Sequence, residues 1–237
     1  QAGVLLGKTL QGSGRWEAAV SSWREVLDAY PDFVPALAAL AEARMIQGDF
    51  LAAENYLQRG LRRESENPTL IIMKARLAFE RRQIEECFSE LQKLNIDTLD
   101  NPAAFKLVEL LILLDLDGEA RKLIARLRLE NRERFELANT LVTLGSYEEA
   151  KKLLQPLTSI SAQVLRGRVH ASQLQFDQAK PAFQAVIKVN PAYWPAWYYL
   201  GQTLMDSGEA AEAIQAFLKA LELQPRNVNV LYKLGQA

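Results

Sequence analysis

The sequence predicts an all-α solenoid built from tandem pairs of antiparallel helices. The first observation is a set of small residues that recurs roughly every 29 to 34 residues, a period typical of repeated supersecondary units. The set comprises Ala19, Ala53, Cys87, Ala120, Ala150, Ala179 and Ala213. The second observation is a large apolar residue one helical turn after each of them, namely Trp23, Leu57, Leu91, Ile124, Leu154, Phe183 and Phe217. The period decides the fold class before any residue-level chemistry is considered.

Each repeat is expected to hold two helices, and the last complete repeat shows why. The first helix presents one apolar stripe, formed at three- and four-residue spacing by Trp197, Leu200, Gly201 and Leu204. The second helix presents a stripe formed by Ala213, Phe217 and Ala220. Gly208 lies between them and ends the first helix. Because Gly201 and Ala213 are small, we expect the two helices to cross closely at these positions.

Prolines mark the ends of several second helices. Pro31, Pro191 and Pro225 are placed to stop them, since proline lacks the amide donor and clashes with the preceding turn. Asp177 is predicted to cap the second helix of the sixth repeat. That assignment would put Pro181 in the first helical turn, where a missing N–H is tolerated.

We expect residues 1–237 to form a single solenoid, because one helix pair cannot bury its apolar faces without neighbours. The predicted units are approximately 1–33, 34–67, 68–100, 101–130, 131–159, 160–193 and 194–227, with a partial unit at 228–237. The connections around residues 128–162 are expected to be shortened, with tighter turns. The chain begins inside a helix without an initiator Met and ends inside a repeat, so we expect it to be a fragment of a longer protein.

The repeats resemble the tetratricopeptide repeat (TPR) family. The last complete one reads Trp197-x2-Leu200-Gly201-x2-Leu204, then Gly208, Ala213-x3-Phe217 and Pro225, and only Leu204 replaces a usual tyrosine. The third repeat departs most, because Lys74, Arg82 and Cys87 replace the usual Leu, Gly and Ala. The resemblance covers essentially the whole chain. It implies a right-handed superhelix whose first helices line the concave face.

Composition offers little material for catalysis. The chain is 49% hydrophobic and 24% charged with a net charge of −1, so no overall field favours nucleic acid or a membrane. The single His170 and the single Cys87 are expected to be packing residues, and they supply neither a zinc set nor a Cys–His pair. We therefore expect no enzyme activity, no cofactor and no metal.

One basic cluster stands out within this near-neutral chain. It comprises Arg121, Lys122, Arg126, Arg128, Arg132 and Arg134. A solvated face partly paired with Glu119 and Glu130 is favoured over an anion or nucleic-acid patch. No nucleic-acid partner is expected.

The candidate partner-binding residues come from the resemblance, which implies that the residue after each Leu–small pair points into the concavity, with neighbours one turn away. They are Arg76, Phe79, Phe105, Glu109, Phe135, Asn139, Arg168, Tyr198, Gln202 and Tyr232. Scattered charges over apolar and aromatic side chains favour binding of a protein or peptide. Transfer of the carboxylate clamp of chaperone-tail-binding TPR domains fails, because Phe135 stands where its first Lys would be.

The sequence thus predicts a protein–protein interaction scaffold that binds an extended or helical segment of a partner. Two alternatives remain: a periplasmic scaffold of bacterial polysaccharide export or envelope assembly, and the regulatory array of a larger enzyme such as a glycosyltransferase. Alanine-rich, lysine-poor helices favour a bacterial source. The compartment, cytoplasm or bacterial periplasm, stays open, and no membrane insertion is expected.

Overall fold

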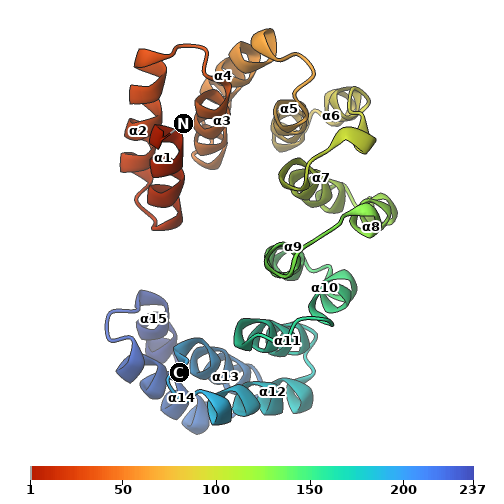
Figure 1. The fold of residues 1–237 in the computed structure, drawn as a ribbon. Coiled ribbons are helices and arrows are strands. Elements are labelled where there is room, and N and C mark those ends of the chain that lie inside the picture. Colours follow the sequence, from red (N-terminus) through yellow and green to blue (C-terminus); the bar gives the residue numbers. More distant parts are fainter. Residues whose placement is uncertain (1) are drawn as a thin grey trace. The chain divides into compact units, whose positions relative to one another are not determined.

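The computed structural model describes residues 2–237, which form consecutive α-helices joined by short turns (Figure 1). The helices are α1 (Ala2–Gly12), α2 (Trp16–Ala29), α3 (Val34–Ile46), α4 (Phe50–Arg63), α5 (Pro68–Glu80), α6 (Ile84–Leu91), α7 (Asn101–Leu113), α8 (Asp117–Arg126), α9 (Asn131–Thr143), α10 (Tyr147–Leu154), α11 (Ile160–Ser172), α12 (Phe176–Val189), α13 (Trp194–Asp206), α14 (Ala210–Leu223) and α15 (Val228–Gln236). A 3-10 helix, η1 (Ile96–Thr98), lies between α6 and α7, and the described residues contain no strand. The prediction of an all-α helical-repeat solenoid is confirmed.

The chain forms two compact units, residues 1–127 and residues 128–237. Within each unit, the two helices of a repeat pack against each other, as α3 does against α4 and α13 against α14. First helices of neighbouring repeats also pack together: α3 contacts α5 and α5 contacts α7 in unit 1, and α11 contacts α13 in unit 2. The organisation of residues 1–237 as a single right-handed solenoid stays a prediction.

A left-handed residue sets the start of every second helix. The backbone φ is positive at Gly14, Gly48, Arg82, Asp115, Gly145, Leu174 and Gly208. Each of them lies two residues before the second helix of its repeat. Glycine adopts this conformation without steric cost, whereas a side chain is strained there by contact with the backbone. Arg82, Asp115 and Leu174 therefore hold a strained turn that the stacking of the repeats maintains.

The prediction that Pro181 lies in the first turn of its helix is wrong, and the turn at Leu174 explains why. Leu174 fixes the start of α12 at Phe176, with Gln175 rather than Asp177 at the N-cap position. Pro181 consequently lies inside α12 and not in its first turn. The carbonyl of Asp177 loses its helical partner, but Asp177 is exposed, so water can bond to it.

The fourth and fifth repeats are short because their second helices, α8 and α10, are short. The expectation that their connections would be shortened is wrong. The second helices α2, α4, α12 and α14 each have 14 residues, whereas α8 has 10 and α10 has 8. Residues 127–130 precede α9 just as residues 30–33 precede α3. Helix α10 ends at Leu154, two residues before Pro156, which has no N–H to continue the helical hydrogen bonds. Arg166 of α11 donates to the carbonyl oxygens of Leu154 and Leu157 there, which satisfies groups left free by the early end.

The third repeat, which departs most from the repeat pattern, contains a partly buried ion pair. Lys74 stands where other repeats carry an apolar residue, and its Nζ lies 2.6 Å from Oε1 of Glu90, which is 4% exposed. Lys93 Nζ lies 2.8 Å from Oε2 of the same carboxylate. Burial raises the pKa of Glu90, but the bonds to Lys74 and Lys93 outweigh this effect and hold its pKa below the ordinary value. The charge of Lys74, which departs from the repeat pattern, is thus compensated by the carboxylate of Glu90.

Candidate functional site

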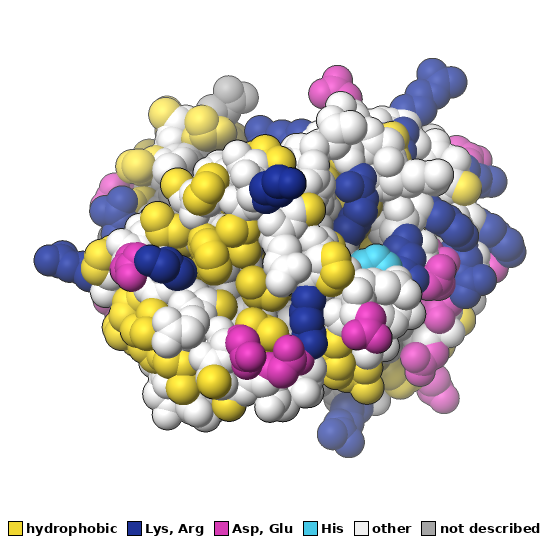
Figure 2. Space-filling model, turned by 90° about the horizontal axis from the view of Figure 1, so that it is seen from below, with side chains coloured by type: hydrophobic (Ala, Val, Ile, Leu, Met, Phe, Trp, Pro, Cys, Tyr) yellow, Lys and Arg dark blue, Asp and Glu magenta, His cyan; other side chains and the backbone are white. Residues whose placement is uncertain are grey.

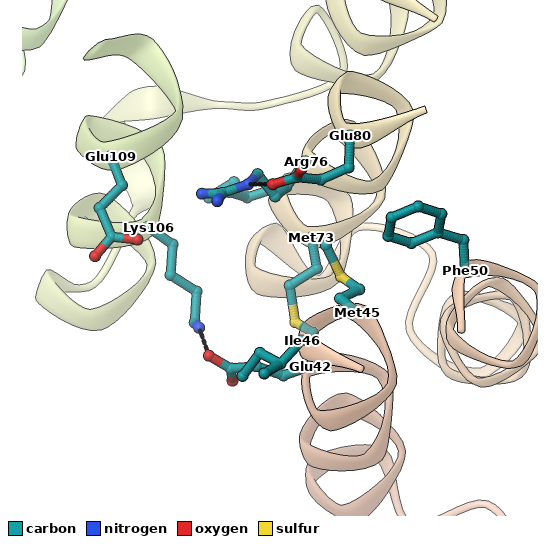
Figure 3. A pocket seen from close by; sticks show the side chains of 10 residues that line it. Glu42, Met45, Ile46, Phe50, Met73, Arg76, Glu80, Lys106 and Glu109 are labelled. Atoms are coloured by element: carbon teal, nitrogen blue, oxygen red, sulfur yellow. Dashed lines mark hydrogen bonds and ion pairs between the residues drawn. The ribbon is translucent and has the colours of Figure 1, made fainter. Parts of the chain in front are cut away.

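A cavity of about 280 Å³ lies on the first helices of unit 1 (Figure 3). The residues lining it come from α3, α4, α5 and α7: Glu42, Met45, Ile46, Phe50, Ile72, Met73, Arg76, Glu80, Lys106 and Glu109. Two of the candidate partner-binding residues, Arg76 and Glu109, belong to this set. Phe79 and Phe105 are half-buried on α5 and α7 and are not among the lining residues.

The apolar part of the cavity combines a fixed floor with a more exposed side. Ile72 and Met73 are 1% and 4% exposed, so they form part of the core. Met45 and Phe50 are half-buried, and Ile46 is 61% exposed. Methionine side chains adapt to ligands of different shape, because they are unbranched and flexible. The half-buried Met45 can therefore adjust its side chain, whereas Ile72 and Met73 are held in the core.

Two ion pairs border the cavity. Lys106 Nζ on α7 lies 2.8 Å from Oε1 of Glu42 on α3, although these helices belong to repeats separated by α5. Arg76 Nε lies 2.7 Å from Oε1 of Glu80, one turn along α5. Figure 3 shows Lys106 reaching from α7 to Glu42 on α3, and Arg76 beside Glu80 on α5. The bond between Lys106 and Glu42 joins α7 directly to α3, although α5 lies between them in the chain.

Glu109 is the remaining charged residue of the cavity. Burial raises the pKa of its carboxyl, and the attraction of Lys106 and Arg76 opposes this only in part, while Glu42 adds to it. Sequence reasoning found Arg76 and Glu109 but missed Lys106 and Glu80. Lys106 lies three residues before Glu109 on the same helix, so helix periodicity alone places the two side chains on the same face.

In unit 2 the predicted residues form two small groups. Arg168 Nη1 on α11 donates to Oδ1 of Asn139 on α9 at 2.9 Å. The guanidinium of Arg168 also lies 4.8 Å from the ring centroid of Tyr199, a cation–π arrangement. The structure thus brings Asn139 and Arg168 together and holds Arg168 from two sides.

Tyr198 forms the centre of the second group. Its ring centroid lies 5.1 Å from that of Tyr199 and 6.1 Å from that of Phe217, so it packs partly into the core. Gln202 Nε2 donates to the Tyr198 hydroxyl at 3.2 Å. Phe135 is half-buried on α9, and Tyr232 on α15 is 64% exposed.

His170 and Cys87 occupy packing positions. Cys87 is fully buried, which raises the pKa of its thiol. His170 is half-buried, with Nδ1 2.8 Å from Oε1 of Gln175. Among residues 2–237 no group of three or more His, Cys, Asp or Glu side chains is placed to hold a metal ion. In the same residues, no helix combines the length and the apolar character needed to cross a membrane.

Three residues of the basic cluster form ion pairs with nearby carboxylates. Lys122 pairs with Glu119 at 2.8 Å, Arg126 with Asp97 at 3.1 Å, and Arg132 with Glu136 at 2.8 Å. Arg134 Nε donates to the carbonyl oxygen of Leu129 at 3.1 Å. Figure 2 shows one face of the molecule, on which both acidic and basic side chains are exposed. These contacts favour the solvated-face interpretation of the cluster.

The chain belongs to the tetratricopeptide repeat family, whose model matches residues 4–68 and 164–228. The peroxisomal targeting signal receptor of Candida glabrata is 39% identical over 73 residues, which cover 31% of this chain and 12% of the receptor. The human superkiller complex protein 3 is 24% identical over 98% of this chain and 16% of its own length. The chain therefore spans only a small part of these two relatives.

A solved structure supports the fold over the whole chain. The tetratricopeptide repeat protein from Parabacteroides merdae aligns with a TM-score of 0.54 at 16% identity, and the alignment covers 99% of this chain and 96% of that one. At this identity the likeness concerns the fold alone. Because the matches described come from fungi, human and a bacterium, they do not favour a bacterial source. Their names also give no support to the polysaccharide-export alternative.

Proposed function

We propose that the chain is a non-enzymatic scaffold that binds an extended or helical segment of a partner protein along its first helices. The observation that carries this proposal is the cavity of unit 1, where an apolar floor lies beside charges of both signs. Arg76 and Glu109 contribute to it directly. The other candidate partner-binding residues extend the same kind of surface along the first helices of each unit.

The size of the cavity suits one or two side chains of a peptide. Ligand pockets usually enclose about 300–1,000 Å³ and bury most of their ligand. The cavity of about 280 Å³ lies near the lower end of that range and can take one or two side chains. A partner segment would thus place successive side chains in successive depressions, while its backbone stays near the surface.

The relatives support this interpretation in general terms. The family is typical of protein-interaction scaffolds, and the matched proteins include a targeting signal receptor and subunit 3 of the anaphase-promoting complex. The partners of those proteins are not carried over to this chain. What is carried over is the use of stacked helix pairs as a binding surface.

Selection from a library of random nine-residue peptides displayed on phage tests the proposal. The immobilised chain should enrich peptides, and their affinity should fall about tenfold or more in Ile46→Asp, because this exposed residue lines the cavity. Leu51→Asp is the matched control, since Leu51 is 71% exposed on α4 and is not a lining residue. Failure to enrich any peptide, or equal losses in the two variants, would contradict the proposal.

A further inference from the structure

The charges that line the cavity of unit 1 do not balance. Three carboxylates, Glu42, Glu80 and Glu109, face two cations, Arg76 and Lys106. Both cations are committed to other carboxylates: Lys106 to Glu42 at 2.8 Å and Arg76 to Glu80 at 2.7 Å. The cavity therefore carries one uncompensated negative charge, on Glu109.

Glu109 has only long-range attraction to its neighbours. Among residues 2–237 its carboxylate makes no hydrogen bond or ion pair, although it is half-buried on α7. Figure 3 shows it projecting from the same helix as Lys106, whose ammonium is turned to Glu42 instead. A carboxylate removed from part of its water without a bonded partner is a site that a cation from outside can satisfy.

The apolar side chains decide what kind of cation fits. Met45 is half-buried and Ile46 is 61% exposed beside the charged side chains, so a bare inorganic ion would leave these two in contact with water. A basic side chain next to an aliphatic one meets both requirements, because its ammonium or guanidinium reaches Glu109 while the aliphatic neighbour covers Met45 and Ile46.

We propose that this cavity binds a partner segment in which a Lys or Arg side chain adjoins a large aliphatic residue, with the cation paired to Glu109. The inference rests on the proposed function and adds the charge that the partner must carry. The ion pairs of Glu42 and Glu80 stay in place on binding. Because each pair has no net charge, it favours neither a basic nor an acidic residue of the partner. The selectivity for a basic residue therefore comes from Glu109.

Phage selection of random nine-residue peptides on the wild type and on Glu109→Gln tests the preference. The wild type should enrich peptides with Lys or Arg beside Leu, Ile or Met, and the enrichment of Lys and Arg should vanish in Glu109→Gln. The variant is nearly isosteric, and circular dichroism checks that it is folded. Glu66→Gln removes an exposed carboxylate from the connection 64–67 and serves as the matched control, with the wild-type preference expected.

A titration then assigns the preference to one pair of groups. Replacing the basic residue of a selected peptide by norleucine should weaken binding about tenfold or more on the wild type, since bonds to charged groups are strong, and less than about threefold on Glu109→Gln. Peptides enriched without a basic preference, or with one that persists in Glu109→Gln, would overturn this inference and leave the scaffold proposal intact. A wild type that enriches no peptide would overturn the scaffold proposal itself.

Discussion

Gly201 on α13 lies directly against the ring of Phe217 on α14. A Cβ atom at Gly201 would stand 2.7 Å from Cε1 and 2.8 Å from Cδ1 of that ring, closer than carbon atoms approach. Phe217 is fully buried, so its ring has no free space to move into. The same relationship joins Gly167 to Phe183, where the added Cβ would lie 2.6 Å from Cε1. Residue size on the first helix is therefore matched to ring size on the second.

Gly201→Ala should destabilise the chain by roughly 1–3 kcal/mol, because the ring and both helices must shift. The loss should be largely recovered in Gly201→Ala/Phe217→Leu, where the smaller side chain makes room for the methyl group. Urea denaturation of the two single variants and the double variant measures the coupling. Gly235→Ala is the control, since nothing lies within 4 Å of its added Cβ. Additive effects of the two changes would refute the size-matching relationship.

Leu174→Gly should raise the free energy of unfolding by roughly 0.5–1 kcal/mol. Leu174 is 73% exposed with φ of 59°, so glycine relieves backbone strain and removes little buried surface. The gain is reduced by the greater freedom of glycine in the unfolded chain. The reverse change, Gly208→Ala, should cost a similar amount, since its φ is 85° and no neighbour lies within 4 Å. Denaturation midpoints that shift in the same direction for both variants would be inconsistent with this account.

Lys74→Leu should destabilise by roughly 1–3 kcal/mol, because Glu90 is 4% exposed and would keep only Lys93 as a charged partner. The double variant Lys74→Leu/Glu90→Leu should recover much of this loss, since both positions then match an apolar core. Thermal unfolding followed by circular dichroism compares the variants. A double variant less stable than Lys74→Leu would show that the pair is needed for reasons other than charge compensation.

Glu109→Gln should gain stability relative to the wild type as the pH rises from about 4 to about 7. Burial raises the folded-state pKa of Glu109, so the folded chain binds more protons than the unfolded chain just above the ordinary carboxyl pKa. Stability is then lost as the pH rises through the raised pKa, and glutamine removes this loss. Urea denaturation at both pH values, with Glu66→Gln as the reference, measures the difference. A constant difference between Glu109→Gln and wild type would argue against the raised pKa.

Phe135→Ala/Tyr198→Ala should weaken binding of a partner segment by about 2 kcal/mol or more for each aromatic that acts as an anchor. The candidate charges on the first helices alternate in sign, so the affinity should depend only modestly on salt. Titration with a partner protein identified by pull-down measures both effects.

Controls for this variant must separate binding from folding, because Tyr198 also packs against Phe217. Tyr198→Phe keeps that packing and should retain most of the affinity. Phe88→Ala removes a 40% exposed aromatic from the second helix α6 and should leave binding unchanged. Wild-type affinity in a folded Phe135→Ala/Tyr198→Ala variant would exclude these two residues from the binding surface.

Much of the fold could be read from local patterns. The spacing of Trp197, Leu200 and Leu204 predicts the apolar stripe of α13, and the positions of Pro31, Pro191 and Pro225 predict the ends of α2, α12 and α14. These features follow from helix periodicity and from the missing proline N–H, both of which act within a few residues. The interpretation of Pro181 failed because the turn at Leu174 outweighed the capping preference of Asp177.

The sequence by itself determined the repeat period, the helix pairs, the small-to-large matching of facing positions and the candidate status of Arg76 and Glu109. Only the tertiary structure decided which side chains meet across repeats. It pairs Lys106 on α7 with Glu42 on α3, leaves Glu109 without a bonded partner among residues 2–237, and fixes Arg168 between Asn139 and Tyr199. The physical reason is that periodicity specifies the face of a helix on which a residue lies. The partner it contacts depends on how neighbouring helices stack and on where each one ends.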